Sequence, residues 1–283
     1  MVTAAAAALA LGGVMLASQA RAADVSVLYA GSLVNLMEHG IGAAFDASSG
    51  DHFVGYAGGS NALANQIKGR LRRADVFVSA SPKVNDALTG AANGNWVSWY
   101  VTFAKSPLLI AYNPRGRFAA ELRSKPWYEV LREPGIRIGR TDPALDPKGR
   151  LTLQLLQRAE QVYHQPGLAQ AVLGAPNNPA QVRPEESLAG RMQSGQLDVG
   201  FFYSTEATDL KLPSIKPAPE VATGAIYTAT ILRDAADPAG AARYVNFLLG
   251  EPGQAVLHRH GLQTVAPVLA GDKATVPAAV HFR

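Results

Sequence analysis

Two short turns in the sequence pair glycine with serine where an apolar run ends and a helical pattern begins. The first is Gly31-Ser32, after "VLYA", and the second is Gly58-Gly59-Ser60, after "VGYA". A helix start offers unpaired N–H groups and the positive end of the helix dipole, glycine admits close approach of a ligand, and serine adds a hydroxyl donor. One such turn is an ordinary helix cap. Two of them in neighbouring strand-helix units indicate a site for a small anion.

Two polar turns in the second half of the chain have the same construction. "GIRIGRTDPALDPKGR" leads from a strand pattern into a helix, and "DVGFFYSTEATDL" ends a strand at Tyr203. Asp142 and Asp146 could suggest acid/base chemistry or a cation site, but each precedes proline, which is typical of a turn. We therefore expect turn chemistry, with Asp142 also near the ligand. Lys148 and Arg150 follow closely, so the identity of the anion stays open.

The elements that must position these turns alternate between strand and helix along the chain. Strand patterns occur in "VSVLYA", "HFVGYA", "ADVFVSA", "GIRIGRT", "DVGFFYS" and "GAIYTATILRD", and most are followed by a helical pattern. This alternation predicts an α/β fold built from mostly parallel sheets flanked by helices. Two segments of similar construction, each of about a hundred residues, predict two lobes. We expect lobe 1 to comprise 23–108 with the return of 228–283, and lobe 2 to comprise 109–227, with "NWVSWYVTFAKSPLLIAYNP" crossing between them as a hinge.

The first 22 residues form an apolar run that ends in the small-x-small pattern Ala20-Arg21-Ala22. The run is typical of a signal peptide cleaved after Ala22, although the usual positive charges at its start are missing. A retained anchor and a buried N-terminal helix are the alternatives. The chain has no cysteine, which excludes disulfides, thiolate catalysis and cysteine-ligated zinc. We expect a soluble protein exported to the periplasm.

Other function classes find little support in the composition. The net charge of +4, from 26 basic and 22 acidic residues, is too mild to indicate nucleic-acid binding. His258 and His260 stand two residues apart, a spacing that points the two rings to different faces of a helix. The sequence contains no metalloprotease motif, no serine-hydrolase motif and no phosphate-loop motif. We therefore expect no enzyme activity, no cofactor and no site for a free metal cation.

Taken in order, the motifs resemble the molybdate/tungstate-binding proteins of ABC importers, within the type II periplasmic binding proteins. The resemblance rests on "YAGSL", "AGGSNALANQI", "ADVFVSAS", "LLIAYNP", "GRTDPALDPKGR", "DVGFFYSTEA" and "AARYVNFLLGEPGQAVLHRHGL", which cover nearly the whole mature chain. It implies the two-lobed type II fold. It also implies that an oxyanion is held from the first lobe by Ser32 and Ser60, with Gly31 and Gly59 beside them. From the second lobe the implied ligand groups are Asp142, or its backbone neighbours, and the Tyr203 phenol.

One residue departs from the pattern that we expect in the archaeal tungstate-binding branch, which places an acidic residue directly before this tyrosine. Phe202 stands there instead. The departure favours a tetrahedral oxyanion held by hydrogen bonds over a metal coordination completed by carboxylates.

The resemblance implies a monomeric solute-binding protein that captures molybdate or tungstate and delivers it to an ABC permease by hinge closure. Sulfate, thiosulfate and phosphate are alternative ligands. An exported hydrolase that uses Asp142 or Asp146 is a rival, but it would need a nucleophile and a paired base that the sequence does not show. The effector lobes of a transcription regulator are a second rival, which would require a DNA-binding helix-turn-helix segment.

Overall fold

The computed structural model describes residues 23–282, and the predicted signal peptide lies outside them. The strands of this part of the chain form a nine-stranded sheet whose main path runs β2-β1-β3-β8-β4-β6-β5, with β7 and β9 also paired to β4. The strands are β1 (Asp24–Ala30), β2 (His52–Gly58), β3 (Val76–Ser79), β4 (Trp99–Tyr112), β5 (Ile138–Gly139), β6 (Val199–Tyr203), β7 (Ser214–Ile215), β8 (Gly224–Ile231) and β9 (Gln263–Gly271).

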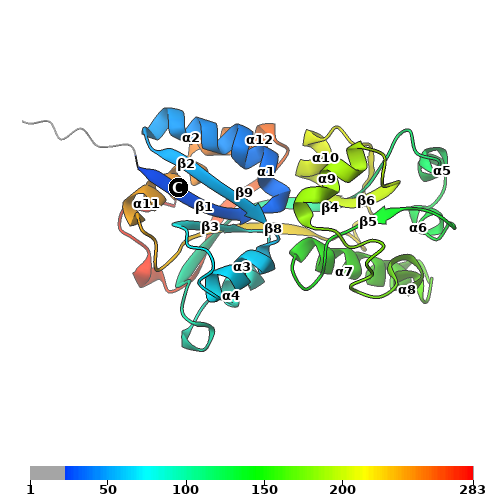
Figure 1. The fold of residues 1–283 in the computed structure, drawn as a ribbon, viewed down its shortest axis with the longest axis horizontal. Coiled ribbons are helices and arrows are strands. Elements are labelled where there is room, and N and C mark those ends of the chain that lie inside the picture. The colour runs from blue at the N-terminus through cyan, green and yellow to red at the C-terminus, as the bar shows by residue number, and fades with distance from the viewer. Residues whose placement is uncertain (1–22, 283) are drawn as a thin grey trace, which may run out of the picture.

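Strand β4 joins two groups of elements that lie side by side along the long axis of the molecule (Figure 1). Its first part pairs with β8 and β9, and its last five residues, from Leu108 to Tyr112, pair with β6. The crossing strand predicted from the sequence therefore spans both groups. The exact lobe boundaries at 108/109 and 227/228 stay a prediction.

Helices flank the sheet in both groups (Figure 1). Those of the first group are α1 (Val34–Leu36), α2 (Gly42–Ser49), α3 (Ser60–Lys68), α4 (Pro82–Asp86), α11 (Pro238–Leu249) and α12 (Glu251–Arg259). Those of the second group are α5 (Ala119–Ser124), α6 (Trp127–Val130), α7 (Pro147–Val162), α8 (Leu168–Leu173), α9 (Glu185–Gln193) and α10 (Ser204–Asp209). None of the helices described in residues 23–282 has the length and apolar character that a membrane span requires.

The expectation of mostly parallel sheets is wrong, although the α/β fold class is confirmed. β1 pairs in parallel with β2 and β3, and β5 pairs in parallel with β6. All the named pairings of β4 and β8, with each other and with β3, β6, β7 and β9, are antiparallel. The parallel pairs β1–β2 and β1–β3 are joined by helical crossovers, whereas β4 and β8 run in opposite directions between the two groups. The sheet is therefore mixed in both groups.

The first three strands are arranged so that two helix starts meet at one edge of the sheet. Burial on both faces explains the continuous apolar runs of β1 and β3, whose residues from Val27 to Ala30 and from Val76 to Ser79 are almost all inaccessible. The β1–β2 register ends with Ala30 beside Gly58. The turns that follow these two residues are therefore neighbours, at the carboxyl edge where open α/β sheets bind ligands.

Candidate functional site

The two Gly-Ser turns predicted from the sequence lie side by side in the structure. Ser32 belongs to a short 3₁₀ turn that follows β1, and Ser60 is the first residue of α3. The Ser32 hydroxyl is hydrogen-bonded to the Tyr227 hydroxyl of β8 at 3.0 Å, and Ser60 Oγ accepts a hydrogen bond of 3.1 Å from the Ala80 N–H. That bond uses a lone pair of Ser60 Oγ and leaves its proton to donate. Both serines are buried.

Glycine is required at both turns because the second group packs directly on them. A Cβ atom at Gly31 would lie 2.5 Å from Glu185 Cγ, and one at Gly59 would lie 2.8 Å from the Leu145 carbonyl oxygen. Both distances are too short for a side chain, so the missing Cβ atoms let α9 and the turn before α7 approach. The serines thus face the second group across a tight junction.

The two aspartates of the Asp-Pro turns have different surroundings. Asp146 is the N-cap of α7, and its Oδ1 accepts hydrogen bonds from the Lys148 N–H at 2.7 Å and from Thr141 Oγ1 at 3.2 Å. Asp142 is half-buried and accepts a bond of 2.8 Å from the Ala144 N–H. Both side chains therefore perform the predicted turn chemistry. Both line a cavity at the junction between the groups, but only Asp146, at 5% exposure, is buried there.

Tyr203 stands where predicted, at the end of β6 and directly before α10. Its ring meets the Tyr227 ring edge-on, with centroids 6.1 Å apart. The Tyr203 hydroxyl is buried and has no hydrogen-bond partner in the described part of the chain. Burial raises the pKa of both phenols well above the ordinary value, so both keep the proton that they could donate to an anion.

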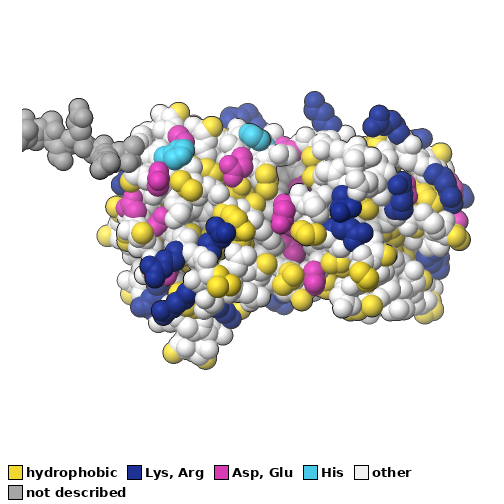
Figure 2. Space-filling model, viewed as in Figure 1, with side chains coloured by type: hydrophobic (Ala, Val, Ile, Leu, Met, Phe, Trp, Pro, Cys, Tyr) yellow, Lys and Arg dark blue, Asp and Glu magenta, His cyan; other side chains and the backbone are white. Residues whose placement is uncertain are grey.

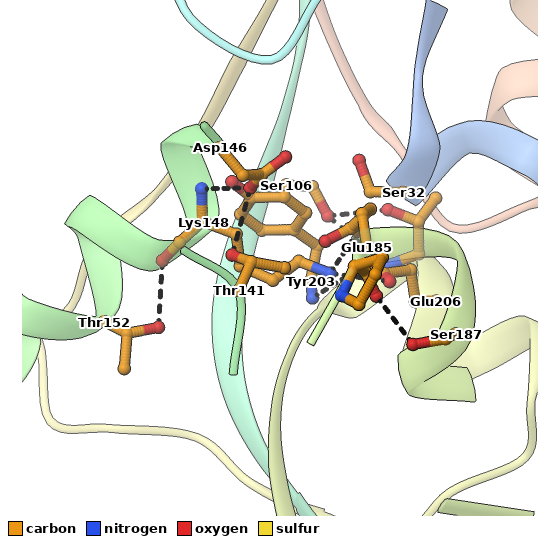
Figure 3. Close-up of polar contacts among 12 residues, drawn as sticks. Ser32, Ser106, Thr141, Asp146, Lys148, Thr152, Glu185, Ser187, Tyr203 and Glu206 are labelled. Carbon is orange, nitrogen blue, oxygen red and sulfur yellow. Dashed lines mark hydrogen bonds and ion pairs between the residues drawn. The ribbon is translucent and has the colours of Figure 1, made fainter. Parts of the chain in front are cut away.

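A buried charge cluster adjoins these residues (Figure 3). Lys148 Nζ lies 2.5 Å from Glu185 Oε1 and 2.7 Å from Glu206 Oε1. The second Glu206 oxygen accepts a bond of 2.9 Å from the Tyr203 N–H, whereas Glu185 Oε2 is buried without a partner among residues 23–282. The sequence placed Lys148 near the site but gave no sign of the two glutamates, because a glutamate in the first turn of a helix is commonplace.

The charges in this cluster perturb one another strongly. Burial, reinforced by the nearby Glu185 carboxylate, raises the pKa of Asp146 to about 7 and that of Glu206 to about 8, against the opposing effect of Lys148. Burial by itself would lower the pKa of the Lys148 ammonium, but Glu185, Glu206 and Asp146 raise it above its usual value. Lys148 is therefore charged throughout the physiological range, while two of the carboxyl groups titrate near neutral pH.

The expectation drawn from Phe202, a tetrahedral oxyanion held by hydrogen bonds, stays a prediction. Successive residues of a strand point to opposite faces, yet the rings of Phe202 and Tyr203 both lie near the Lys148 ammonium, with centroids 5.3 Å and 5.0 Å from Nζ. Phe202 packs in a core cluster with Leu188 and Met192. Carboxylates reach the site from the helix starts of α7, α9 and α10 instead, so phenylalanine at this position does not make the site free of carboxylates.

Two cavities flank Glu185 at the junction. One, of about 310 Å³, is lined by Ser32 and Glu206 among others, and the other, of about 300 Å³, by Gly59 and Asp146. Figure 2 shows acidic side chains along this junction in the same view as Figure 1. Arg150 instead lines a separate cavity of about 370 Å³ together with Lys83. Among residues 23–282, no cluster of three or more histidines or carboxylates is arranged to hold a metal cation.

Solved structures share this fold. The structure is similar to the periplasmic molybdate-binding protein of Azotobacter vinelandii, with a TM-score of 0.65, 20% identity, and coverage of 84% of this chain and 98% of that one. It is also similar to Peb3 of Campylobacter jejuni, with a TM-score of 0.62, 12% identity and coverage of 85% and 99%. At these identities the likeness shows the fold, which is that of the type II periplasmic binding proteins, as expected from the sequence.

The family follows from the sequence comparisons. The profile of the bacterial extracellular solute-binding proteins matches residues 25–263, and the chain belongs to this family. An uncharacterized solute-binding protein of Petrotoga mobilis is 27% identical over 288 residues, which cover 90% of this chain and 88% of the relative. The putative ABC transporter molybdenum-binding protein of Haloferax volcanii is 31% identical over 196 residues, with coverage of 69% and 60%. The molybdate/tungstate-binding protein WtpA of Thermococcus kodakarensis is 26% identical over 265 residues, with coverage of 77% and 74%. The resemblance seen in the sequence motifs is thus confirmed.

Proposed function

We propose that this protein captures molybdate or tungstate outside the cytoplasmic membrane, in the periplasm, and delivers it to the permease of an ABC importer. It acts as a monomer, performs no chemistry on the anion and needs no cofactor. The named relatives that bind molybdate or tungstate support this choice of ligand.

The observation that carries the proposal is a buried hydrogen-bond donor without a partner at the junction of the two groups. The Tyr203 hydroxyl is buried and unpaired in the described chain. Buried polar groups are nearly always hydrogen-bonded, and an exception calls for a missing partner such as an ion. The neighbouring donors are the Ser32 and Ser60 hydroxyls and the backbone N–H groups of the helix starts behind Gly31 and Gly59. Together these groups suit an oxyanion bound between the lobes.

The carboxyl groups are compatible with such an anion in two ways. A protonated carboxyl donates a hydrogen bond to an oxyanion, and the pKa of about 7 at Asp146 makes this form accessible near neutral pH. Alternatively, a carboxylate oxygen of Glu185 or Asp146 coordinates the hard Mo(VI) or W(VI) centre itself, since such centres prefer oxygen ligands. Asp146 takes the place proposed for Asp142, because Asp146 is the buried member of the pair.

Hinge closure is the proposed mechanism because the two groups are bridged by few polar contacts. Asn61 Nδ2 donates to the Ala144 carbonyl at 3.0 Å, and the Ala62 N–H donates to the Leu145 carbonyl at 3.0 Å. His260 Nδ1 lies 3.1 Å from Asp209 Oδ1 on the opposite side of the junction. A ligand that contacts both groups binds the closed form more tightly than the open form. Binding therefore shifts the protein toward the closed form, which the permease recognises.

A thermal-shift screen of residues 23–283 against molybdate, tungstate, sulfate, thiosulfate and phosphate tests the proposal. Stabilisation by a ligand follows RT ln(1 + [L]/Kd), so a hundredfold excess over Kd adds about 2.7 kcal/mol. We expect melting shifts of this size with molybdate and tungstate at concentrations where the other anions give none. If only sulfate or phosphate shifts the melting temperature, that anion is the ligand instead of molybdate or tungstate. If no anion shifts it, the proposal is refuted.

A further inference from the structure

The charge balance of the junction poses a problem for an anion site. The two cavities that flank Glu185 are lined by one basic side chain, Arg183, and by six acidic side chains, namely Asp142, Asp146, Glu185, Glu186, Glu206 and Asp209. A dianion placed among these groups meets like charges in a medium that screens them poorly. Something in the protein must offset this repulsion.

Lys148 is the cation placed to do so. Its side chain is completely buried, with 0% exposure, and its ammonium contacts the carboxylates of Glu185 and Glu206 directly. If Asp146, Glu185 and Glu206 are all ionised, their total charge is −3, and the lysine brings the net charge of the cluster to −2. Protonation of Asp146 and Glu206 near neutral pH makes this net charge less negative. The same contact holds Glu185 so that its second oxygen stays unpaired beside the site.

We propose that Lys148 determines the preference of this carboxyl-rich junction for an anion, by compensating Glu206 and by positioning Glu185, rather than by serving as the main ligand of the anion. The inference rests on the proposed function, because it presumes that the ligand is an oxyanion. Two of the three ammonium protons of Lys148 are donated to the carboxylates of Glu185 and Glu206. The lysine therefore acts on the anion chiefly through these two carboxylates.

A buried ion cluster of this kind is not needed for stability alone. Replacing a whole buried ion pair by residues of similar volume is often neutral, whereas removing one partner leaves an uncompensated charge. The role of Lys148 can therefore be tested with two variants. The first removes the lysine charge alone, and the second removes it together with the charge of Glu206. In Lys148→Met/Glu206→Gln, the carbonyl oxygen of the introduced side chain still accepts from the Tyr203 N–H, and its NH₂ group is left to donate toward Glu185.

The experiment measures the Kd of molybdate and tungstate by calorimetry for the wild type, Lys148→Met, the double variant Lys148→Met/Glu206→Gln and the control Lys125→Met. Lys125 is a surface residue that pairs with Glu121 at 2.7 Å, so its substitution removes the same charge far from the site. We expect Lys148→Met to weaken binding by about a hundredfold or more, the double variant to recover to within about tenfold of the wild type, and the control to bind like the wild type.

Three results would overturn the inference: wild-type affinity in Lys148→Met, a double variant that folds but binds no better than Lys148→Met, or a double variant that fails to fold. If Lys148→Met alone unfolds, a double variant that folds and binds still supports it. Failure of the proposed function looks different, because the wild type itself then binds neither molybdate nor tungstate. In that case the same four proteins are compared with whichever of sulfate, thiosulfate or phosphate the wild type binds, and a wild type that binds none overturns both.

Discussion

Tyr203→Phe should move stability and ligand affinity in opposite directions. The substitution keeps the ring in its place against Tyr227 and removes only a buried hydroxyl that has no partner in the described chain. An unsatisfied buried polar group costs about 1 to 3 kcal/mol, so the ligand-free variant should be at least as stable as the wild type. A gain of about 1 kcal/mol would raise Tm by roughly 2 to 4 °C in a chain of this size.

Ligand binding should weaken in the same variant. A hydrogen bond to a charged group contributes about 1.5 to 3 kcal/mol, which corresponds to roughly a 10- to 150-fold increase in Kd for molybdate or tungstate. Calorimetric titration gives Kd, and thermal unfolding without ligand gives the change in stability. Tyr227→Phe is the matched control, because its hydroxyl is bonded to Ser32 at 3.0 Å and its loss should lower stability. If Tyr203→Phe lowers the ligand-free Tm as Tyr227→Phe does and leaves Kd unchanged, the hydroxyl does not face the ligand and the reasoning fails.

Three further predictions concern other groups of the site. Ser32→Ala and Ser60→Ala should each raise the Kd of the anion by about one to two decades, measured by calorimetry, since each removes a hydroxyl from a buried site; wild-type affinity in both would reduce the two turns to helix caps. The folded chain keeps a proton on Asp146 up to about pH 7 and on Glu206 up to about pH 8, whereas the unfolded chain releases both near pH 4. The folded state therefore binds more protons between about pH 4 and pH 8, and the free energy of unfolding should fall as the pH rises through this window. Anion affinity should weaken over the upper part of the same window as these groups become negative, and Asp146→Asn should flatten the stability profile; a flat wild-type profile would contradict the assigned shifts. Arg150→Gln should slow anion association several-fold at low ionic strength in stopped-flow fluorescence and leave it unchanged at high salt, because Arg150 lines a neighbouring basic cavity; an equal effect at all salt concentrations would argue against steering.

The Gly-Ser turns could be predicted from the sequence because their signal is local. An apolar run followed by glycine, serine and a helical pattern defines both the end of a strand and the start of a helix, and both turns formed as expected. The order of such units also predicted that the turns would be neighbours, which the β1–β2 register confirms. Tyr203 was predictable for the same reason, as the last residue of an apolar run.

The charge cluster could not be predicted because its members are far apart in the sequence. Lys148, Glu185 and Glu206 stand in the first turns of three different helices, where the two glutamates look like ordinary partners of the helix dipole. Which of the two aspartates is buried was also hidden, since Asp142 and Asp146 have the same local pattern. Only the packing of α7 shows that Asp146 is buried.

Strand direction was the main error in the fold. Apolar runs mark strands but do not tell in which direction each one crosses the sheet, so the antiparallel pairings of β4 and β8 were missed. β9 was not expected at all. Among the strands of residues 23–282 it pairs with β4 alone, and it contains Pro267, a residue that interrupts a strand pattern and is tolerated at a sheet edge or an irregular register.

The central claim, that an oxyanion is held between the two lobes by groups from both, is tested most directly by a crystal structure of the protein with tungstate. The anomalous signal of tungsten locates the ligand without relying on the shape of the density. The account predicts one strong peak between the two lobes, with tungstate oxygens within hydrogen-bonding distance of the Ser32, Ser60 and Tyr203 hydroxyls. A peak beside Arg150, or one that contacts a single lobe, would contradict it.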